Sequence, residues 1–146
     1  MDLPLNLIAE SIVESCVCLF RNINHTEAEF PHYHIVIPSR VNNYLVLCYI
    51  TKQVENRIWY YRRFDKTEAI NSLVKVDHSD FDFLTAESVI ECNQAEITHK
   101  KAFVSIVHPS HGCQVITRSI PIELDKKIRD AIQQSPVVKP FIKTVI

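Results

Sequence analysis

The sequence predicts a mainly β protein of the α+β type, in which a small barrel or sandwich of short strands carries one helix at each end. From residue 33 onward, short β-branched runs bounded by Pro, Asn and charged residues follow one another closely, as they do in small barrels and sandwiches. The 146 residues, 47% hydrophobic and 23% charged, have the size and composition of one globular domain. We expect a single domain over residues 1–146, with a helix in 1–22, the barrel in 30–118, and a helix and tail in 121–146.

The N-terminal helix is predicted over Leu5–Phe20. Leu5, Ile8, Ile12 and Cys16 fall on one helical stripe, and an apolar stripe of this width is typical of a helix that packs on a core.

The barrel strands are predicted from runs rich in β-branched and aromatic residues that end at turn-forming or charged residues. These runs are His34–Ile37, Tyr44–Thr51, Leu73–Val76, Ser88–Asn93, Ala102–Val107 and Gln114–Thr117.

The C-terminal helix is predicted to start after Pro121, since proline is favoured in a first helical turn. Apolar residues then recur at helical spacing from Ile122 to Ile132. The helix should end at Ser135, because the residue before a proline is disfavoured in helical conformation. The apolar tail Val137–Ile146 is expected to cover a groove or a sheet edge.

Composition excludes several classes of function. The formal net charge is −1, so any affinity for nucleic acid must come from a local cluster of Lys and Arg. Gly112 is the single glycine, which removes phosphate-binding loops and dinucleotide fingerprints, because both need several glycines. No apolar run reaches the roughly 18 residues that span a bilayer, and no secretory signal is recognised, so we expect a cytoplasmic protein without membrane contact.

Five cysteines are scattered along the chain, and an odd number in this arrangement predicts buried thiols rather than a disulfide framework. They are Cys16, Cys18, Cys48, Cys92 and Cys113.

Two histidines are the first candidates for catalysis. His32 and His34 precede or open a strand, so in an extended chain their imidazoles point to the same side. Imidazole titrates near neutral pH and can serve as general acid or base. The alternatives are strand-end histidines bonded to backbone carbonyls, or half of a metal site.

Aromatic and cationic residues alternate in the segment Arg57–Arg63, with Lys52 upstream. Single-stranded nucleic acids are bound by such surfaces, where bases stack on rings and phosphates meet Arg or Lys. The competing interpretation is a half-buried strand with two alternating faces.

Metal binding is a further alternative because the chain has seven histidines. His108 and His111 followed by Cys113 can be read as zinc ligands, but the paired Cys-x-x-Cys motifs that make such predictions specific are missing. A loop rich in His, Pro and Ser is the favoured interpretation.

The order of three segments resembles the MazF/PemK-type ribonuclease toxins. These segments are His34–Pro38, Tyr44–Lys52 and Glu87–Gln94. In that family an early strand leaves an Arg-rich loop, the next strand ends in Pro-Ile-Thr-Ser, and a later one carries a Ser-Val-Val-Leu-Leu-Asp-Gln type pattern. The resemblance covers about residues 30–135 and implies an SH3-like barrel.

The resemblance also implies a function: the toxin of a toxin–antitoxin system, a metal-independent endoribonuclease that cleaves single-stranded RNA and needs no cofactor. In it the ribose 2′-hydroxyl attacks the adjacent phosphate, His34 or His32 handles a proton, and Thr51 matches the family's phosphate-contacting Thr or Ser. A homodimer and a cognate antitoxin protein are implied as well. The expected RNA-binding cations are Arg40, Lys52, Arg57, Arg62 and Arg63.

The chain departs from the family pattern at two places. Where the family has its catalytic Arg, this chain has His32 or His34, and the family's Arg-Thr after Asp-Gln is replaced by Ala95-Glu96. Arg21 and Arg40 are nearby candidates for the missing positive charge. The departures leave two alternatives open: a non-catalytic nucleic-acid- or protein-binding module on the same barrel, and a histidine-rich metal-binding protein.

Overall fold

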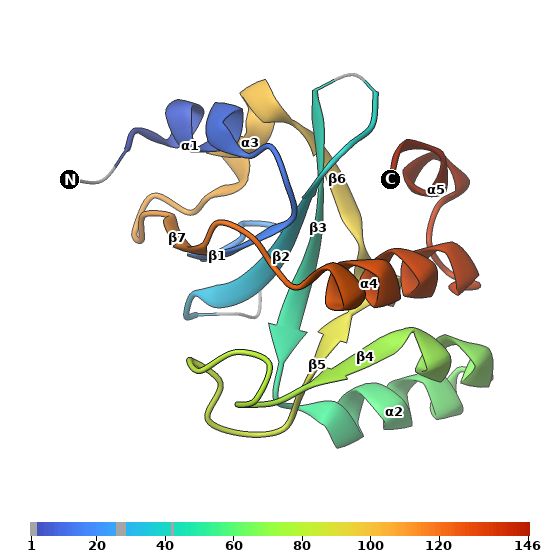
Figure 1. Cartoon of the computed structure of the whole chain (residues 1–146). Coiled ribbons are helices and arrows are strands. Elements are labelled where there is room, and N and C mark those ends of the chain that lie inside the picture. Colours follow the sequence, from blue (N-terminus) through green and yellow to red (C-terminus); the bar gives the residue numbers. More distant parts are fainter. Residues whose placement is uncertain (1–2, 26–28, 42) are drawn as a thin grey trace.

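The computed structural model describes residues 3–25, 29–41 and 43–146 (Figure 1). In these residues seven strands form one antiparallel sheet in the order β4-β5-β3-β2-β1-β7, with β6 also paired to β3. The strands are β1 Cys16–Phe20, β2 His32–Pro38, β3 Tyr44–Thr51, β4 Leu73–Val76, β5 Ser88–Glu91, β6 Glu96–His99 and β7 Gln114–Thr117. The predicted mixture of strands and helices is confirmed, but the sheet is open rather than closed into a barrel.

The helices lie between and beyond the strands. The α-helices are α1 Leu5–Ser11, α2 Val54–Arg63, α3 Phe103–Ile106, α4 Ile122–Gln134 and α5 Pro140–Val145, and the short 3-10 helices are η1 Thr67–Ser72, η2 Cys92–Gln94 and η3 Lys100–Ala102. Within the described ranges, no helix combines the length and apolar character needed to cross a bilayer.

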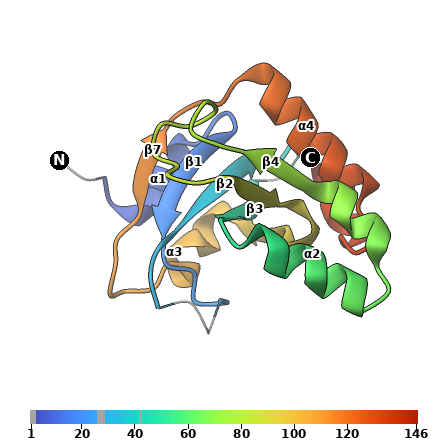
Figure 2. The ribbon, with the colours of Figure 1, turned by 90° about the horizontal axis from the view of Figure 1, so that it is seen from below.

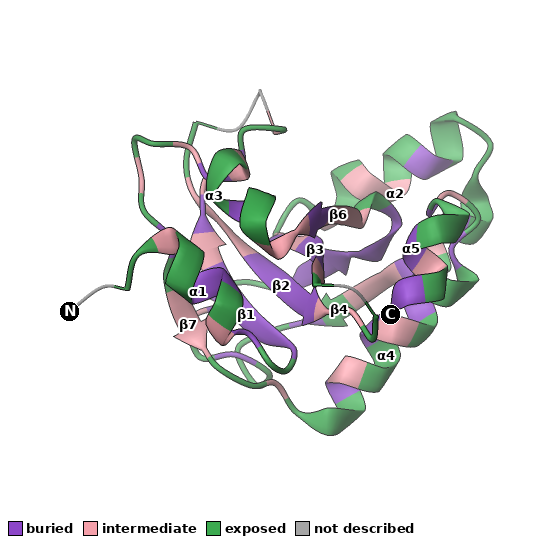
Figure 3. Ribbon diagram, turned by 90° about the horizontal axis from the view of Figure 1, so that it is seen from above, coloured by how far each residue is buried: buried purple, intermediate pink, exposed green. Residues whose placement is uncertain are grey.

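Both faces of the sheet are covered, as the alternation along β3 shows. Leu45 and Leu47 face a core that includes residues of α1 and α3, whereas Val46 and Ile50 face the larger core under α4 and α5. Successive side chains of a strand point to opposite faces, so a strand buried on both faces is apolar throughout. The central strands are accordingly buried along most of their length (Figure 3).

The predicted C-terminal helix is confirmed as α4, which buries Leu124, Ile128, Ala131 and Ile132. The tail after it turns back as α5, and its apolar side chains join the same core. This burial explains why so many apolar residues occur at the end of the chain.

The N-terminal prediction was wrong in its second half. The helix ends at Ser11, and Cys16–Phe20 form strand β1, which pairs with β2 and β7; residues 1 and 2 lie outside the described ranges. Because β1 is buried on both faces, its continuous apolar run is compatible with a helical stripe when only the sequence is read.

Three further predictions are corrected. Residues 57–63 lie in helix α2 and not in a strand, the predicted strand Ala102–Val107 is mostly helix α3, and the predicted strand over Ser88–Asn93 ends at Glu91. Strand β6 was missed, because its four residues carry polar side chains at Glu96, Thr98 and His99.

The sheet changes partner along one edge of β3. Strand β6 pairs with Tyr44–Leu47 and β5 pairs with Ile50 and Thr51, so Cys48 and Tyr49 lie between the two pairings. The turn of η2 connects β5 to β6 at this place. A local opening in the sheet therefore lies beside Tyr49.

The packing of α4 gives a direct test of the fold. Ile128 is fully buried and Ile122, in the same helix, is 87% exposed. We expect Ile128→Ala to lower the free energy of unfolding by about 2–5 kcal/mol, because it removes buried methyl groups and leaves a cavity. Ile122→Ala should change it by no more than about 0.5 kcal/mol. Urea denaturation measures both, and equal effects of the two variants would contradict this placement of α4.

Candidate active site

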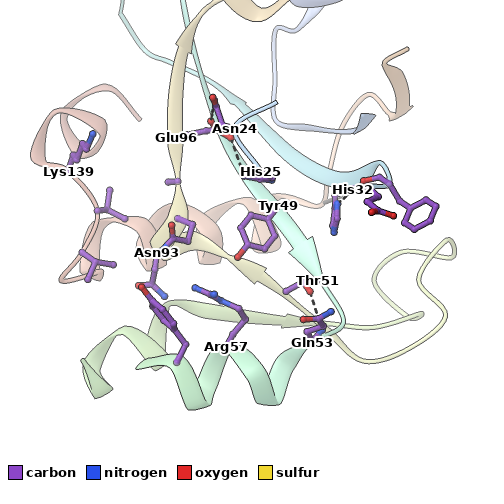
Figure 4. Close-up of a pocket in the computed structure, with 17 residues that line it drawn as sticks. Asn24, His25, His32, Tyr49, Thr51, Gln53, Arg57, Asn93, Glu96 and Lys139 are labelled. Atoms are coloured by element: carbon purple, nitrogen blue, oxygen red, sulfur yellow. Dashed lines mark hydrogen bonds and ion pairs between the residues drawn. The ribbon is translucent and has the colours of Figure 1, made fainter. Parts of the chain in front are cut away.

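A pocket of about 1030 Å³ opens beside Tyr49, where β3 exchanges β6 for β5. Helix α2 forms one wall and lies across the sheet from α4 (Figure 2). The other walls come from the turn before β2, the ends of β2 and β3, η2, and the segment after α4. The lining residues are Asn24, His25, Glu29, Phe30, His32, Tyr49, Thr51, Gln53, Arg57, Tyr60, Asn93, Gln94, Ala95, Glu96, Val137, Val138 and Lys139 (Figure 4).

The wall formed by α2 contains a buried ion pair. Arg57 Nε donates to Glu91 Oε2 at 2.6 Å, and the Tyr61 hydroxyl donates to the same oxygen at 2.9 Å. Glu91 is fully buried at the end of β5, while the Arg57 side chain remains 21% exposed. A buried carboxylate is tolerated only when its charge and lone pairs are satisfied, so Glu91 holds α2 and its guanidinium in place.

The second oxygen of Glu91 ties this pair to the rest of the pocket. Oε1 accepts from the backbone N–H of Asn93 at 3.1 Å and from the Asn93 side-chain amide at 3.0 Å. The Asn93 amide oxygen accepts from the Ser135 hydroxyl at 2.7 Å. The network therefore connects α2, η2 and the end of α4.

Electrostatics keep this wall cationic. Burial alone would lower the pKa of Arg57, but the acidic groups of Tyr49 and Glu91 raise it above its ordinary value. Burial and the Glu91 charge raise the pKa of Tyr61 to about 12, and burial raises the pKa of Tyr49 as well. Arg57 and the hydroxyl end of Tyr49 point toward one another in the pocket (Figure 4).

His32, predicted from the sequence, lines the pocket at the start of β2. Its Nδ1 lies 3.2 Å from the Phe30 carbonyl oxygen. A carbonyl can only accept, so this contact assigns the proton to Nδ1 and leaves Nε2 as a proton acceptor. Its ring centroid is 6.4 Å from that of Tyr49.

His34, the other predicted histidine, is fully buried beneath the pocket and does not line it. Its ring stacks on Phe20 at 4.1 Å, and its Nδ1 donates to the His32 carbonyl oxygen at 2.8 Å. Nε2 is buried without a hydrogen-bond partner among the described residues. Burial, helped by the charge of His25, lowers the pKa of His34 to about 3.

A third imidazole, His25, lines the pocket and was not predicted. The turn that carries it is fixed by Asn22, whose side-chain oxygen accepts from the Asn24 N–H at 2.9 Å and whose carbonyl accepts from the His25 N–H at 3.1 Å. His25 Nε2 lies 3.7 Å from a carboxylate oxygen of Glu96. Burial lowers the pKa of His25, and Glu96 opposes this shift.

Glu96 is itself held on both sides. Its carboxylate accepts from the side-chain amides of Asn22 and Asn24. Held in this way, the Glu96 carboxylate orients His25. The His25 ring lies 5.1 Å from Tyr49 and 5.9 Å from His34, measured between centroids. Tyr49 is thus a neighbour of both pocket imidazoles, His25 and His32.

Thr51, also predicted, lines the pocket at the end of β3. Its Oγ1 accepts from the Gln53 backbone N–H at 3.1 Å, which fixes the turn into α2. Because Oγ1 acts as acceptor in this bond, its own proton can be donated to a ligand in the pocket.

The predicted cations are dispersed. Of these, Arg57 lines the pocket, Lys52 is exposed next to Thr51, and Arg62 and Arg63 are exposed farther along α2. Arg40 lines a separate pocket of about 650 Å³ beside α4. The positive charge at the site therefore comes from Arg57 on α2 and from Lys139 on the segment after α4, not from the loops that carry Arg21 and Arg40.

Glu91 had a signal in the sequence that was not used. A carboxylate inside the apolar run of β5 must be buried, and a buried charge demands a partner. His25 and Glu96 had no comparable signal, because the sequence does not show that their two segments meet.

The histidine-rich loop shows no metal-binding geometry. The Ser110 hydroxyl lies between Nδ1 of His108, at 2.6 Å, and Nδ1 of His111, at 2.8 Å. In the described part of the chain, no group of three or more His, Cys, Asp or Glu side chains is arranged to hold a metal ion. All five cysteines are free and buried, as predicted.

Neither a scan against protein-family models nor a search of curated proteins gives a match for this chain.

The burial of His34 predicts a pH dependence of stability. Its pKa falls from 6.5 to about 3 on folding, so the unfolded chain binds the proton more tightly. Stability should be unaffected above pH 6.5 and should decrease as the pH falls from 6.5 toward 3, by up to about 1.4 kcal/mol per pH unit. We expect His34→Phe to reduce this slope in urea denaturation between pH 4 and pH 7.

Phe20→Leu is the control for this experiment. It removes the ring that stacks on His34 but no titrating group, so it should lower stability at every pH and keep the slope. A His34→Phe variant with the slope of the wild type would show that His34 is not the group responsible.

The buried ion pair predicts a second stability effect. We expect Arg57→Ala to cost about 3–5 kcal/mol, because the buried Glu91 is left without its cation. Arg129 and Asp125 form a pair of similar length, 2.9 Å, with both side chains about one-quarter exposed, so Arg129→Ala should cost less than about 1 kcal/mol. Chemical denaturation compares them, and similar costs would argue against Glu91 as the dominant constraint.

Proposed function

We propose that the pocket binds single-stranded RNA and cleaves it as a metal-independent endoribonuclease of the MazF/PemK toxin type. The observation that carries the proposal is the meeting of three kinds of group in one pocket: a fixed guanidinium (Arg57), a hydroxyl (Thr51) and two oriented imidazoles (His25 and His32). Cleavage of RNA at a phosphodiester needs charge stabilisation and two proton transfers, and these groups can supply both.

Arg57 is suited to bind the phosphate. Its Nε–H donates to Glu91 and one Nη2–H donates to the Tyr61 hydroxyl. The other N–H groups of Arg57 can donate to phosphate oxygens. A guanidinium remains charged at every relevant pH and binds phosphate through paired hydrogen bonds. Thr51 can donate to the same phosphate. Arg57 thereby supplies the positive charge that the resembled family takes from the loop where this chain has histidines.

The two imidazoles are suited to the proton transfers. His32 Nε2 takes the proton of the ribose 2′-hydroxyl as the 2′-oxygen attacks the adjacent phosphorus. The bond from phosphorus to the 5′-oxygen breaks, and His25, oriented by Glu96, donates the proton that this oxygen needs. The products are a 2′,3′-cyclic phosphate and a 5′-hydroxyl end. His34 supports the site from below by donating to the His32 carbonyl oxygen.

The remaining features belong to the same proposal. The meander of β1, β2 and β3, with β5 and β6 both against β3, supports an SH3-like barrel that is opened at β4 and β7. The family resemblance adds a homodimer, a neutralising antitoxin protein and action in the cytoplasm.

The cleavage activity is tested with purified protein and a mixed-sequence single-stranded RNA in excess EDTA. We expect fragments that end in 2′,3′-cyclic phosphate, and a loss of about 10²- to 10⁴-fold in rate for His32→Ala, because one proton transfer is removed. Thr51→Ala should also slow cleavage. Since burial lowers the pKa of His25 below its ordinary 6.5, His25 loses its proton at a pH below 6.5, and the rate should already decline as the pH rises toward neutral.

His111→Ala is the matched control, because this imidazole lies in the loop outside the pocket, and its rate should equal that of the wild type. Cleavage that continues in the His32→Ala and Thr51→Ala variants would point to a contaminating nuclease. RNA that binds to folded wild-type protein but is never cut would favour the non-catalytic binding module.

A further inference from the structure

Helix α2 carries an exposed row of rings and guanidinium groups that begins in the pocket. We call it the stacking row and define it as Arg57, Tyr60, Phe64, Arg63 and Trp59. Its three rings are among the exposed aromatic side chains of the described residues: Trp59 is 58% exposed, Phe64 53% and Tyr60 38%. Rings grouped on one solvent-facing side of a helix indicate a surface that meets a ligand.

Each member of the row contacts the next in the order in which they are named above. The Arg57 guanidinium lies 4.7 Å from the Tyr60 ring centroid, and the Tyr60 and Phe64 centroids are 4.9 Å apart. Arg63 then lies 5.6 Å from the Phe64 ring and 5.0 Å from the Trp59 ring. The row is therefore continuous from Arg57, which lines the pocket, to the C-terminal end of α2.

This chemistry matches single-stranded nucleic acid. Bases stack on aromatic rings whatever their identity, while Arg and Lys contact the phosphates between them. The rise along α2 from Arg57 to Phe64 is about 10 Å, which is about three nucleotides at the 3.4 Å spacing of a stacked strand. The row can therefore accept several nucleotides that leave the pocket.

Charge favours RNA over a protein partner. Residues 52–66 contain five Lys or Arg and two Asp or Glu, an excess of three positive charges in a chain whose net charge is −1. Protein interfaces are also enriched in aromatic residues and Arg, but their centres are depleted of other charged residues and are more apolar than the rest of the surface. In the stacking row Arg57 lies over the Tyr60 ring and Arg63 lies against the Phe64 and Trp59 rings, so the row offers contacts to bases and to phosphates.

We propose that the stacking row binds the nucleotides that flank the scissile phosphate of a single-stranded RNA, by stacking their bases on Tyr60, Phe64 and Trp59. This inference rests on the proposed function of the pocket and adds a binding track that starts at Arg57 and Tyr60 in the pocket and leads out of it. It gives an aromatic role to α2 that is separate from the phosphate-binding role of Arg57.

The experiment uses the single tryptophan of the chain, Trp59, as a direct reporter. The probe is an unlabelled RNA octamer with 2′-O-methyl groups, which cannot be cleaved by 2′-hydroxyl attack. The octamer is titrated into the full chain, and an equivalent dinucleotide is titrated separately. We expect saturable quenching of Trp59 emission by the octamer. The dinucleotide, which fills the pocket alone, should leave the emission unchanged.

A fluorescently labelled form of the same octamer is then used to compare the binding constants of the wild type and its variants by fluorescence anisotropy. Trp59→Ala and Phe64→Ala should each weaken octamer binding about 5- to 100-fold, the loss expected for one base stack, and leave the rate of dinucleotide cleavage unchanged. Phe141→Ala is the matched control, because Phe141 is a 52% exposed ring on α5, and it should bind the octamer as the wild type does.

The outcomes separate the two proposals. Cleavage that depends on His32, with no quenching and with equal octamer affinity in all variants, would overturn the stacking row and leave the proposed function standing. Absence of RNA binding and cleavage at any length would overturn both. Self-association in sedimentation equilibrium that is lost in Trp59→Ala, without RNA binding, would replace the inference by a protein contact.

Discussion

The buried carboxylate of Glu91 is the constraint on which the site depends. A full charge without solvent is tolerated here because four hydrogen bonds reach it, from Arg57, Tyr61 and twice from Asn93. Arg57 and Tyr61 belong to helix α2, and Asn93 belongs to η2, the turn that follows β5. The position of α2, the course of η2 and, through Ser135, the end of α4 are therefore fixed together. A guanidinium presented at the pocket follows directly from this arrangement.

The pocket follows from a second constraint, the change of partner along β3. Since η2 separates β5 from β6, Tyr49 faces an opening where a continuous strand would have covered it. Charge is then distributed unevenly around the opening. Arg57 lies on the α2 side, and His25 with Glu96 lies on the side of the N-terminal turn. Such asymmetry suits a reaction in which negative charge develops at one point and protons move at two others.

Sequence reasoning succeeded where one local signal decided the structure and failed where distant segments had to meet. Strands β3 and β4 are β-branched, apolar runs with clear ends, and helix α4 has a strong helical periodicity. Thr51, suggested by the family resemblance, and His32, suggested by its place before a strand, both line the pocket. Strand β1 was read as helix because burial on both faces hides the two-residue alternation. Helix α2 was not recognised because Tyr61 is its one buried residue and most of its side chains are exposed to solvent. His25 could not be found, since its link to Glu96 spans about half the chain.

Contact between an RNA phosphate and Arg57 is tested most directly by NMR of the arginine side-chain N–H groups during titration with an uncleavable 2′-O-methyl RNA. Arg57 Nε–H, held 2.6 Å from Glu91, should give a resolved signal. We expect saturable shifts of the Arg57 and His32 side-chain signals, with Arg40, which lies at the other pocket, unchanged. RNA that binds and shifts Arg40 or other distant groups, while Arg57 and His32 stay in place, would contradict the assignment of the pocket as the RNA site.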